Sequence, residues 1–192
     1  MPQRTVALLL ADGFEEIEAI APADILRRAG FHVVLLAVGD DPLVVGARQI
    51  AVQADQRLAD FKITPRAAVF PGGMPGAERL GASVEARALA RRVFLAGGVL
   101  GAICAAPAFT LGPWKFLDGK RATCYPGFET RLPSTTSYTE TAVVVDGGMV
   151  TARGPGVALP FAYALVELLA GADAAAQLRA DMRFPPADGG GA

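Results

Sequence analysis

Short apolar runs alternate with helix-like stretches along this 192-residue chain, and this alternation limits the possible fold more than any other feature. Runs rich in valine, leucine and isoleucine are typical of parallel strands buried on both faces, and parallel strands are joined by crossover helices. We therefore expect an α/β fold with a mostly parallel sheet. The expected strands are Thr5–Ala11, Phe31–Val38, Ala67–Phe70 and Val99–Ile103, and the expected helices are Glu15–Arg28, Ser83–Ala96, Ala105–Leu111, Val157–Ala170 and Ala172–Met182.

Local signals add two hairpins and a helix cap to this outline. Gly147 and Gly148 stand between the apolar runs Thr141–Asp146 and Met149–Arg153, which is typical of a two-residue hairpin turn. Val44–Val52 is predicted to form a short hairpin or meander around Gly46. Ser83 is a plausible N-cap for the helix that follows it.

No linker or internal repeat divides the chain. We expect one domain over residues 1–184 and a disordered tail over residues 185–192, whose sequence PPADGGGA has nothing to bury.

Composition excludes several classes of function. A formal net charge of -1 gives no electrostatic footprint for nucleic acid or for an anionic membrane surface. No apolar run reaches the roughly 20 residues that a membrane-spanning helix needs. Two cysteines require no disulfide framework and favour a reducing cytoplasmic setting, and with a single histidine they argue against a zinc site.

Cys104 is the main candidate for chemistry. Free cysteine is often a small buried hydrophobe, but Cys104 falls where an expected strand ends and a helix begins. Ligand crevices form outside the carboxyl ends of parallel strands, and a helix N-terminus lowers the pKa of a thiol from about 8.5 to about 3.5–7.5. Cys104 is therefore predicted to be a nucleophile, whereas Cys124 has no such setting and is predicted to be a core residue.

An acidic segment, DGFEEIE, follows the first expected strand. Glu15 and Glu16 are explained as solvated partners of the helix dipole. Glu18 is followed by Ala19, Ile20 and Ala21, and an acid on an apolar helical face must find a partner or hold a proton. Since this helix also begins at a strand's carboxyl end, we expect Glu18 and Cys104 to share one crevice.

Two further features have limited roles. The loop PGGMPGA lacks the residues of a phosphate loop and the spacing of a dinucleotide site, and its backbone N–H groups are expected to line an anion or oxyanion pocket. His32 begins a strand at the edge of the sheet opposite the crevice. No histidine is therefore expected to serve the thiol as a general base.

Four separated motifs, ADGFEEIEA, FPGGMPGA, GAICAAPAF and ARGPG, resemble those of the ThiJ/PfpI superfamily, and most closely its parkinsonism-associated deglycase (ThiJ-type) branch. The resemblance covers about residues 5–182. It implies a flavodoxin-like three-layer α/β sandwich with a nucleophile elbow, a homodimer, and chemistry that needs neither a metal nor an organic cofactor.

The resemblance also implies roles for individual residues. Cys104 matches the family's oxidation-prone nucleophile, and Glu18 matches the glutamate that hydrogen-bonds its sulfur. Gly73 and Ala105 match backbone N–H donors beside the sulfur, while Arg48 and Arg153 match arginines near the pocket and the dimer interface. Tyr125 departs from the family pattern, because it stands where members with a catalytic triad carry a histidine before proline.

Three functions remain open at this point. The first is a cofactor-independent glyoxalase III or protein deglycase, acting on 2-oxoaldehydes such as methylglyoxal or on their adducts, with a role in oxidative and carbonyl stress. The second is a redox-sensing, chaperone-like stress protein whose key event is the oxidation of Cys104. The third, a structural paralogue with a vestigial pocket, is the weakest, because Cys104 and Glu18 are both present.

Overall fold

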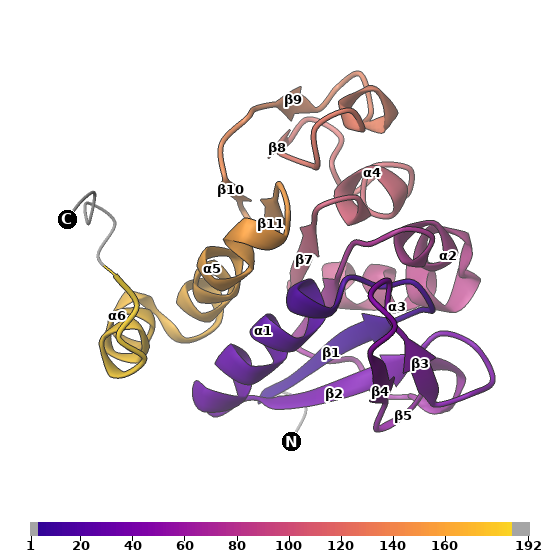
Figure 1. Cartoon of the computed structure of the whole chain (residues 1–192). Helices are drawn as coiled ribbons and strands as arrows, with labels where there is room; N and C mark the ends of the chain where they lie inside the picture. The colour runs from indigo at the N-terminus through magenta and orange to yellow at the C-terminus, as the bar shows by residue number, and fades with distance from the viewer. Residues whose placement is uncertain (1–3, 186–192) are drawn as a thin grey trace.

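The computed structural model describes residues 4–185 and is built around one seven-stranded sheet in the order β10-β11-β7-β6-β1-β2-β5 (Figure 1). Neighbouring strands run parallel throughout, except for the antiparallel pair β10 and β11 at one edge. The strands of this sheet are β1 (Thr5–Leu10), β2 (His32–Ala37), β5 (Gln56–Arg57), β6 (Ala67–Phe70), β7 (Val99–Ile103), β10 (Val143–Asp146) and β11 (Met149–Ala152).

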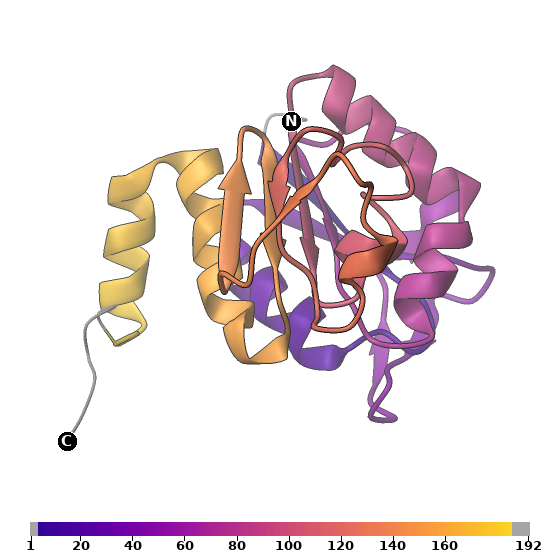
Figure 2. The ribbon, with the colours of Figure 1, turned by 90° about the horizontal axis from the view of Figure 1, so that it is seen from above.

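Helices cover both faces of the sheet. Figures 1 and 2 show α1 and α5 on one side of the sheet and α3 on the other, so the molecule has three layers. Close packing across a layer is visible at Gly101 of β7, where a Cβ atom would lie 2.9 Å from Leu165 and 3.0 Å from Phe161 of α5. The helices are α1 (Glu16–Arg28), α2 (Gly76–Ala82), α3 (Val84–Leu95), α4 (Ala106–Phe109), α5 (Ala158–Ala170) and α6 (Ala172–Asp181).

The local sequence signals are confirmed. β10 and β11 form the hairpin predicted around Gly147, and β3 (Leu43–Val45) pairs with β4 (Ala51–Gln53) as the shorter one. Ser83 caps α3, because its side-chain oxygen accepts a hydrogen bond from the Ala86 N–H at 3.1 Å.

Other elements were not predicted. α2 follows directly on the glycine-rich loop, and β5, β8 (Arg121–Ala122) and β9 (Ser137–Tyr138) are two-residue strands without a periodic pattern. The helix predicted over Ala105–Leu111 is shorter in the structure: α4 ends at Phe109, and Thr110 leaves helical geometry with φ -117° and ψ -83°.

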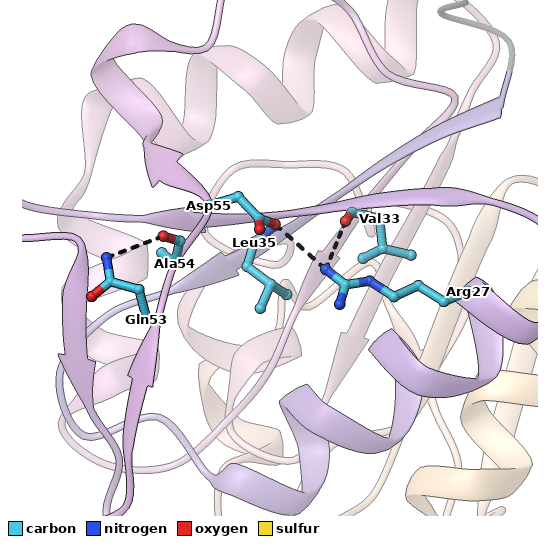
Figure 3. Close-up of polar contacts among 6 residues, drawn as sticks. All are labelled: Arg27, Val33, Leu35, Gln53, Ala54 and Asp55. Carbon is cyan, nitrogen blue, oxygen red and sulfur yellow. Dashed lines mark hydrogen bonds and ion pairs between the residues drawn. The ribbon is translucent and has the colours of Figure 1, made fainter.

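Side chains close part of the β2 edge (Figure 3). β5 pairs with β2 only at Leu36 and Ala37. Before that point, Arg27 Nη2 donates to the Val33 carbonyl at 3.0 Å, and the Leu35 N–H donates to Asp55 Oδ2 at 2.8 Å. The Val33 carbonyl and the Leu35 N–H, at the part of β2 that β5 does not reach, are therefore hydrogen-bonded to side chains.

Residues 186–192, which include most of the tail expected to be disordered, lie outside the described residues. Within residues 4–185, no helix combines the length and apolar character needed to cross a bilayer.

Candidate functional site

Cys104 lies directly after β7, in a sharp connection to α4. Its φ of 63° places a non-glycine residue in the left-handed region, which costs roughly 1–2 kcal/mol. Two backbone hydrogen bonds hold it there: its N–H donates to the Ala152 carbonyl at 2.8 Å, and its carbonyl accepts from the Tyr125 N–H at 2.8 Å. The predicted elbow is therefore a strained turn fixed from both sides.

Glu18, from the first turn of α1, is fully buried beside Cys104. Its Oε2 accepts a hydrogen bond from the Gly72 N–H at 2.8 Å, and its carboxyl group is hydrogen-bonded to the Cys104 thiol. Oε1 has no hydrogen-bond partner among the described residues. Burial raises the pKa of Glu18 to about 7, against the lowering effect of its bonds to Cys104 and Gly72, and the charge of Glu15 raises it further.

The prediction of a lowered cysteine pKa is corrected by this setting. Burial raises the pKa of the Cys104 thiol, the neighbouring Glu18 carboxylate raises it further, and the backbone N–H groups of Gly73 and Ala105 lower it. α4 has only four residues, so its dipole offsets little of the burial cost.

Cys104 and Glu18 must therefore be treated as one proton-sharing pair. When Glu18 holds the proton, its charge no longer opposes a thiolate, and the Gly73 and Ala105 N–H groups remain to stabilise the sulfur. A carboxyl group with a pKa of about 7 can accept and return a proton near neutral pH.

The burial of Glu18 predicts that the stability of the protein depends on pH. The pKa of Glu18 is about 7 in the folded protein against 4.5 for the free side chain, so between these values the folded chain holds a proton that the unfolded chain has released. The free energy of unfolding should therefore fall as pH rises, by up to about 3 kcal/mol between about pH 5 and about pH 8. Urea unfolding of the parent and Glu18→Gln proteins measures this, because only the parent should show the loss. Parallel stability curves for the two proteins would contradict it.

Gly73 is placed to present its N–H to the sulfur. It adopts φ 84°, and a Cβ atom there would lie 2.4 Å from the Glu15 nitrogen and 2.5 Å from the Gly13 carbonyl oxygen. Only glycine can therefore bring this N–H beside Cys104, where the N–H of Ala105 also lies.

The side chains of the remaining site candidates have contacts with residues other than Cys104. Tyr125 is 46% exposed, and its ring packs on Gly154. Arg153 donates to the Glu140 carbonyl at 2.9 Å, and Arg48, largely exposed, pairs with Glu15 at 3.7 Å. The structure thus brings Glu18, Gly73 and Ala105 to Cys104, while the two arginines contact other partners.

Glu16 was predicted to be solvated, and this is wrong. Only 6% of Glu16 is exposed, and its Oε1 accepts hydrogen bonds from the Arg48 N–H at 2.7 Å and the Ile50 N–H at 3.3 Å. It fastens the β3–β4 turn to α1, a long-range role that its helix-start position could not reveal.

The residues expected to be bystanders lie apart from this site. His32 is exposed at the amino end of β2, at the opposite edge of the sheet from Cys104. Cys124 is fully buried, and burial raises its pKa to about 12. Among residues 4–185, no group of three or more histidine, cysteine or acidic side chains is placed to bind a metal ion.

A scan against protein-family models matches residues 4–168 to the DJ-1/PfpI family. The chain belongs to the DJ-1/PfpI family. The flavodoxin-like fold agrees with this: oxidized Toxoplasma gondii DJ-1 is a solved structure with 35% sequence identity and a TM-score of 0.91, covering 95% of this chain and 99% of that one.

Curated DJ-1/PfpI relatives differ in how much of their length this chain spans. Protein DJ-1 homolog B of Arabidopsis thaliana is 34% identical over 97% of this chain, which covers 43% of that protein. The chain thus spans about half the length of the first curated relatives it matches. The glutathione-independent glyoxalase DJR-1.2 of Caenorhabditis elegans is 31% identical over 88% of this chain and 90% of its own length.

Proposed function

We propose that this protein is a cysteine-dependent glyoxalase that converts methylglyoxal-type 2-oxoaldehydes, or their adducts, to 2-hydroxy acids without a cofactor. The observation that carries the proposal is the buried Cys104–Glu18 pair, in which Glu18 has a pKa of about 7. The similarity to a relative named as a glutathione-independent glyoxalase supports the same reaction class. In the deglycase reaction the Cys104 thiolate would displace the amine or thiol of a glycated adduct from the same carbon, Glu18 would give its proton to the leaving group, and the later steps would be the same.

The reaction begins when the Cys104 proton passes to Glu18 and the thiolate attacks the aldehyde carbon. The resulting hemithioacetal oxygen accepts hydrogen bonds from the Gly73 and Ala105 N–H groups. Glu18 first returns the thiol proton to the hemithioacetal oxygen. As a carboxylate it then removes the proton from the former aldehyde carbon and delivers it to the neighbouring carbon, while the hydroxyl proton of the first carbon passes to the ketone oxygen, which gives a thioester of the 2-hydroxy acid. Water hydrolyses the thioester, releasing lactate from methylglyoxal and restoring the thiol.

Tyr125 limits the rate of this reaction. It occupies the position at which the family triad has histidine, and a phenol is a poor general base near neutral pH. Glu18 therefore carries the proton transfers alone, and turnover is expected to be weak. Tyr125, Arg48 and Arg153 are assigned to substrate binding rather than to proton transfer.

Product yield tests the proposal directly. The purified protein, incubated with methylglyoxal in buffer free of glutathione and amines, should form lactate in clear molar excess over protein. Lactate is measured enzymatically, and the protein is analysed by mass spectrometry for the captured aldehyde. Capture at Cys104 without lactate beyond one equivalent would remove the glyoxalase assignment.

Oxidation of Cys104 is the second candidate function. The N–H groups of Gly73 and Ala105, together with the Glu18 carboxyl group, surround the sulfur and can hold the oxygens of a sulfinate. Two molecules of hydrogen peroxide oxidise one thiolate to a sulfinate and are themselves reduced to two molecules of water. Both cysteines are free thiols, which suits the cytoplasmic setting that we assume for either function.

Mild peroxide should add two oxygens to Cys104 and none to Cys124. Cys104 has N–H donors at its sulfur and Glu18 to accept its proton, whereas Cys124 is fully buried and has neither among the described residues. Peptide mass mapping after treatment gives the two extents separately. Equal oxidation of both thiols, or faster oxidation of Cys124, would contradict the assigned role of the elbow.

Assembly as a homodimer is part of the proposal. Ile17 and Ile20 of α1 are 56% and 43% exposed, and an isologous interface would bury both across a two-fold axis. The double change Ile17→Glu and Ile20→Glu should give a monomer in light scattering, while Val84→Glu on α3 should leave the dimer intact. A parent protein that is monomeric at micromolar concentration would refute this assembly.

A further inference from the structure

A cationic and apolar hollow lies on the α3 side of the sheet. Its volume is about 280 Å3, and its lining comes from α3 and from the segment that follows α4. Arg87, Arg91 and Leu95 lie on one helical stripe at four-residue spacing. Phe94 and Phe116 add two ring faces in contact, with centroids 5.3 Å apart.

The cations of this hollow have no acidic partner among the described residues. Arg87, Arg91 and Lys115 form no side-chain hydrogen bond or ion pair with any residue between 4 and 185, and no carboxylate lines the hollow. By contrast, five other arginines pair with an acid: Arg27, Arg28, Arg48, Arg57 and Arg79. Like charges one helical turn apart repel, so Arg87 and Arg91 gain nothing from each other.

Apolar surface is exposed between these cations. Leu95 is 73% exposed and Phe94 is 45% exposed, although the chain keeps most of its large apolar residues buried. Trp114, 6% exposed, lies beneath them, with its indole N–H donating to the Gly81 carbonyl at 3.2 Å. An apolar centre with a charged rim is typical of a protein–protein contact.

We propose that this hollow docks an acidic segment of a partner protein, in which a large apolar side chain is flanked by carboxylates. The apolar side chain would enter between Phe94 and Leu95, and the carboxylates would pair with Arg87, Arg91 and Lys115. Charge complementarity selects this partner, because the hollow is cationic on a chain with a net charge of -1. A concave site of this size suits a side chain better than a flat lipid surface.

The location keeps this surface separate from the other proposed contacts. α3 lies on the opposite side of the sheet from α1, so the proposed dimer face does not cover it (Figure 2). None of its residues belongs to the Cys104 site, so docking and turnover are independent proposals.

The single tryptophan provides a built-in probe, because Trp114 lines the hollow. The test ligand is a capped heptapeptide with a leucine–phenylalanine pair inside aspartates, titrated against the full chain while tryptophan fluorescence is recorded. We expect saturable binding that weakens with added salt. A peptide with lysines in place of the aspartates, and one with serines in place of the apolar pair, should not bind.

Variants locate the contact. Arg87→Gln combined with Arg91→Gln should weaken binding about tenfold, the effect of losing two favourable exposed ion pairs. Leu95→Ser should weaken it through the apolar centre, whereas Arg121→Gln, an exposed arginine elsewhere, should leave binding unchanged. Circular dichroism and thermal unfolding of each variant confirm that the fold is retained.

Three outcomes would overturn the proposal. The first is no saturable change up to about 1 mM peptide. The second is equal binding by the parent and the double arginine variant. The third is binding to vesicles of phosphatidylserine and phosphatidylcholine in place of the peptide, which would assign the hollow to a membrane surface.

Discussion

Replacing Glu18 by glutamine should lower lactate formation from methylglyoxal about 10²–10⁴-fold, the contribution of a positioned general base. The amide has nearly the shape of the carboxyl group and can stay beside Gly72, but it cannot accept and return a proton. A neutral amide does not oppose a thiolate, so Cys104 can lose its proton to solvent, and the Glu18→Gln protein should still form the adduct at Cys104, although more slowly. Lactate release and adduct mass, measured on one sample, separate the two steps.

Substitutions of the two cysteines give a matching test of lactate formation. Cys104→Ser should release no lactate above background, because a serine hydroxyl in this buried site has no base able to ionise it. Cys124→Ala, which removes the other thiol, should keep the parent rate. Equal lactate formation by the parent and the Cys104→Ser protein would exclude the glyoxalase and leave oxidation sensing as the function of Cys104.

Gly72→Ala should destabilise the protein by about 4 kcal/mol or more, above the usual range for an overpacked position. The added Cβ would lie 2.7 Å from the Cys104 Cβ, 2.7 Å from Glu18 Oε2 and 2.9 Å from the Ile103 carbonyl oxygen. Two of these atoms belong to backbone or a strained elbow and cannot move away cheaply. Urea unfolding measures the loss, and loss of activity should accompany it because the Gly72 N–H holds Glu18.

Gly156→Ala is the control for this change. A Cβ atom at Gly156 meets nothing within 4 Å, and this glycine does not require a positive φ. Its stability should stay within about 0.5 kcal/mol of the parent, as for an ordinary surface substitution. Similar stability losses for the two alanine variants would show that crowding at the site is not the cause.

Sequence was sufficient for the strands of the sheet except β5, and for the Cys104–Glu18 pair. β1, β6 and β7 could be predicted from apolar runs. The acidic segment with Glu18 follows β1, the glycine-rich loop follows β6, and Cys104 follows β7. Because parallel strands place their carboxyl ends at one edge, Glu18 and Cys104 could be brought together before any coordinates were known. Glu18 was also marked by the apolar residues around it.

The features that sequence missed depend on contacts between residues that are far apart in the chain. Glu16 looks like any acid at a helix start, but the β3–β4 turn folds over it and supplies two N–H groups. The lowered pKa predicted for Cys104 was wrong for the same reason. Its position before a helix suggested that the helix dipole stabilises the thiolate, but burial and the neighbouring Glu18 carboxylate raise the pKa. A two-residue strand such as β5 has too few residues to show a period, and only its pairing with β2 defines it.

The Arg27–Asp55 arrangement at β2 also limits how molecules of this protein can meet (Figure 3). An open strand edge is a template on which another copy can add a strand, and a chain that is 52% hydrophobic is exposed to that hazard. Here Val33 and Leu35 direct their backbone groups to side chains, one cationic and one anionic, both about half exposed. An incoming strand would have to displace this ion pair and leave its charges unpaired, so this part of the β2 edge resists edge-to-edge aggregation.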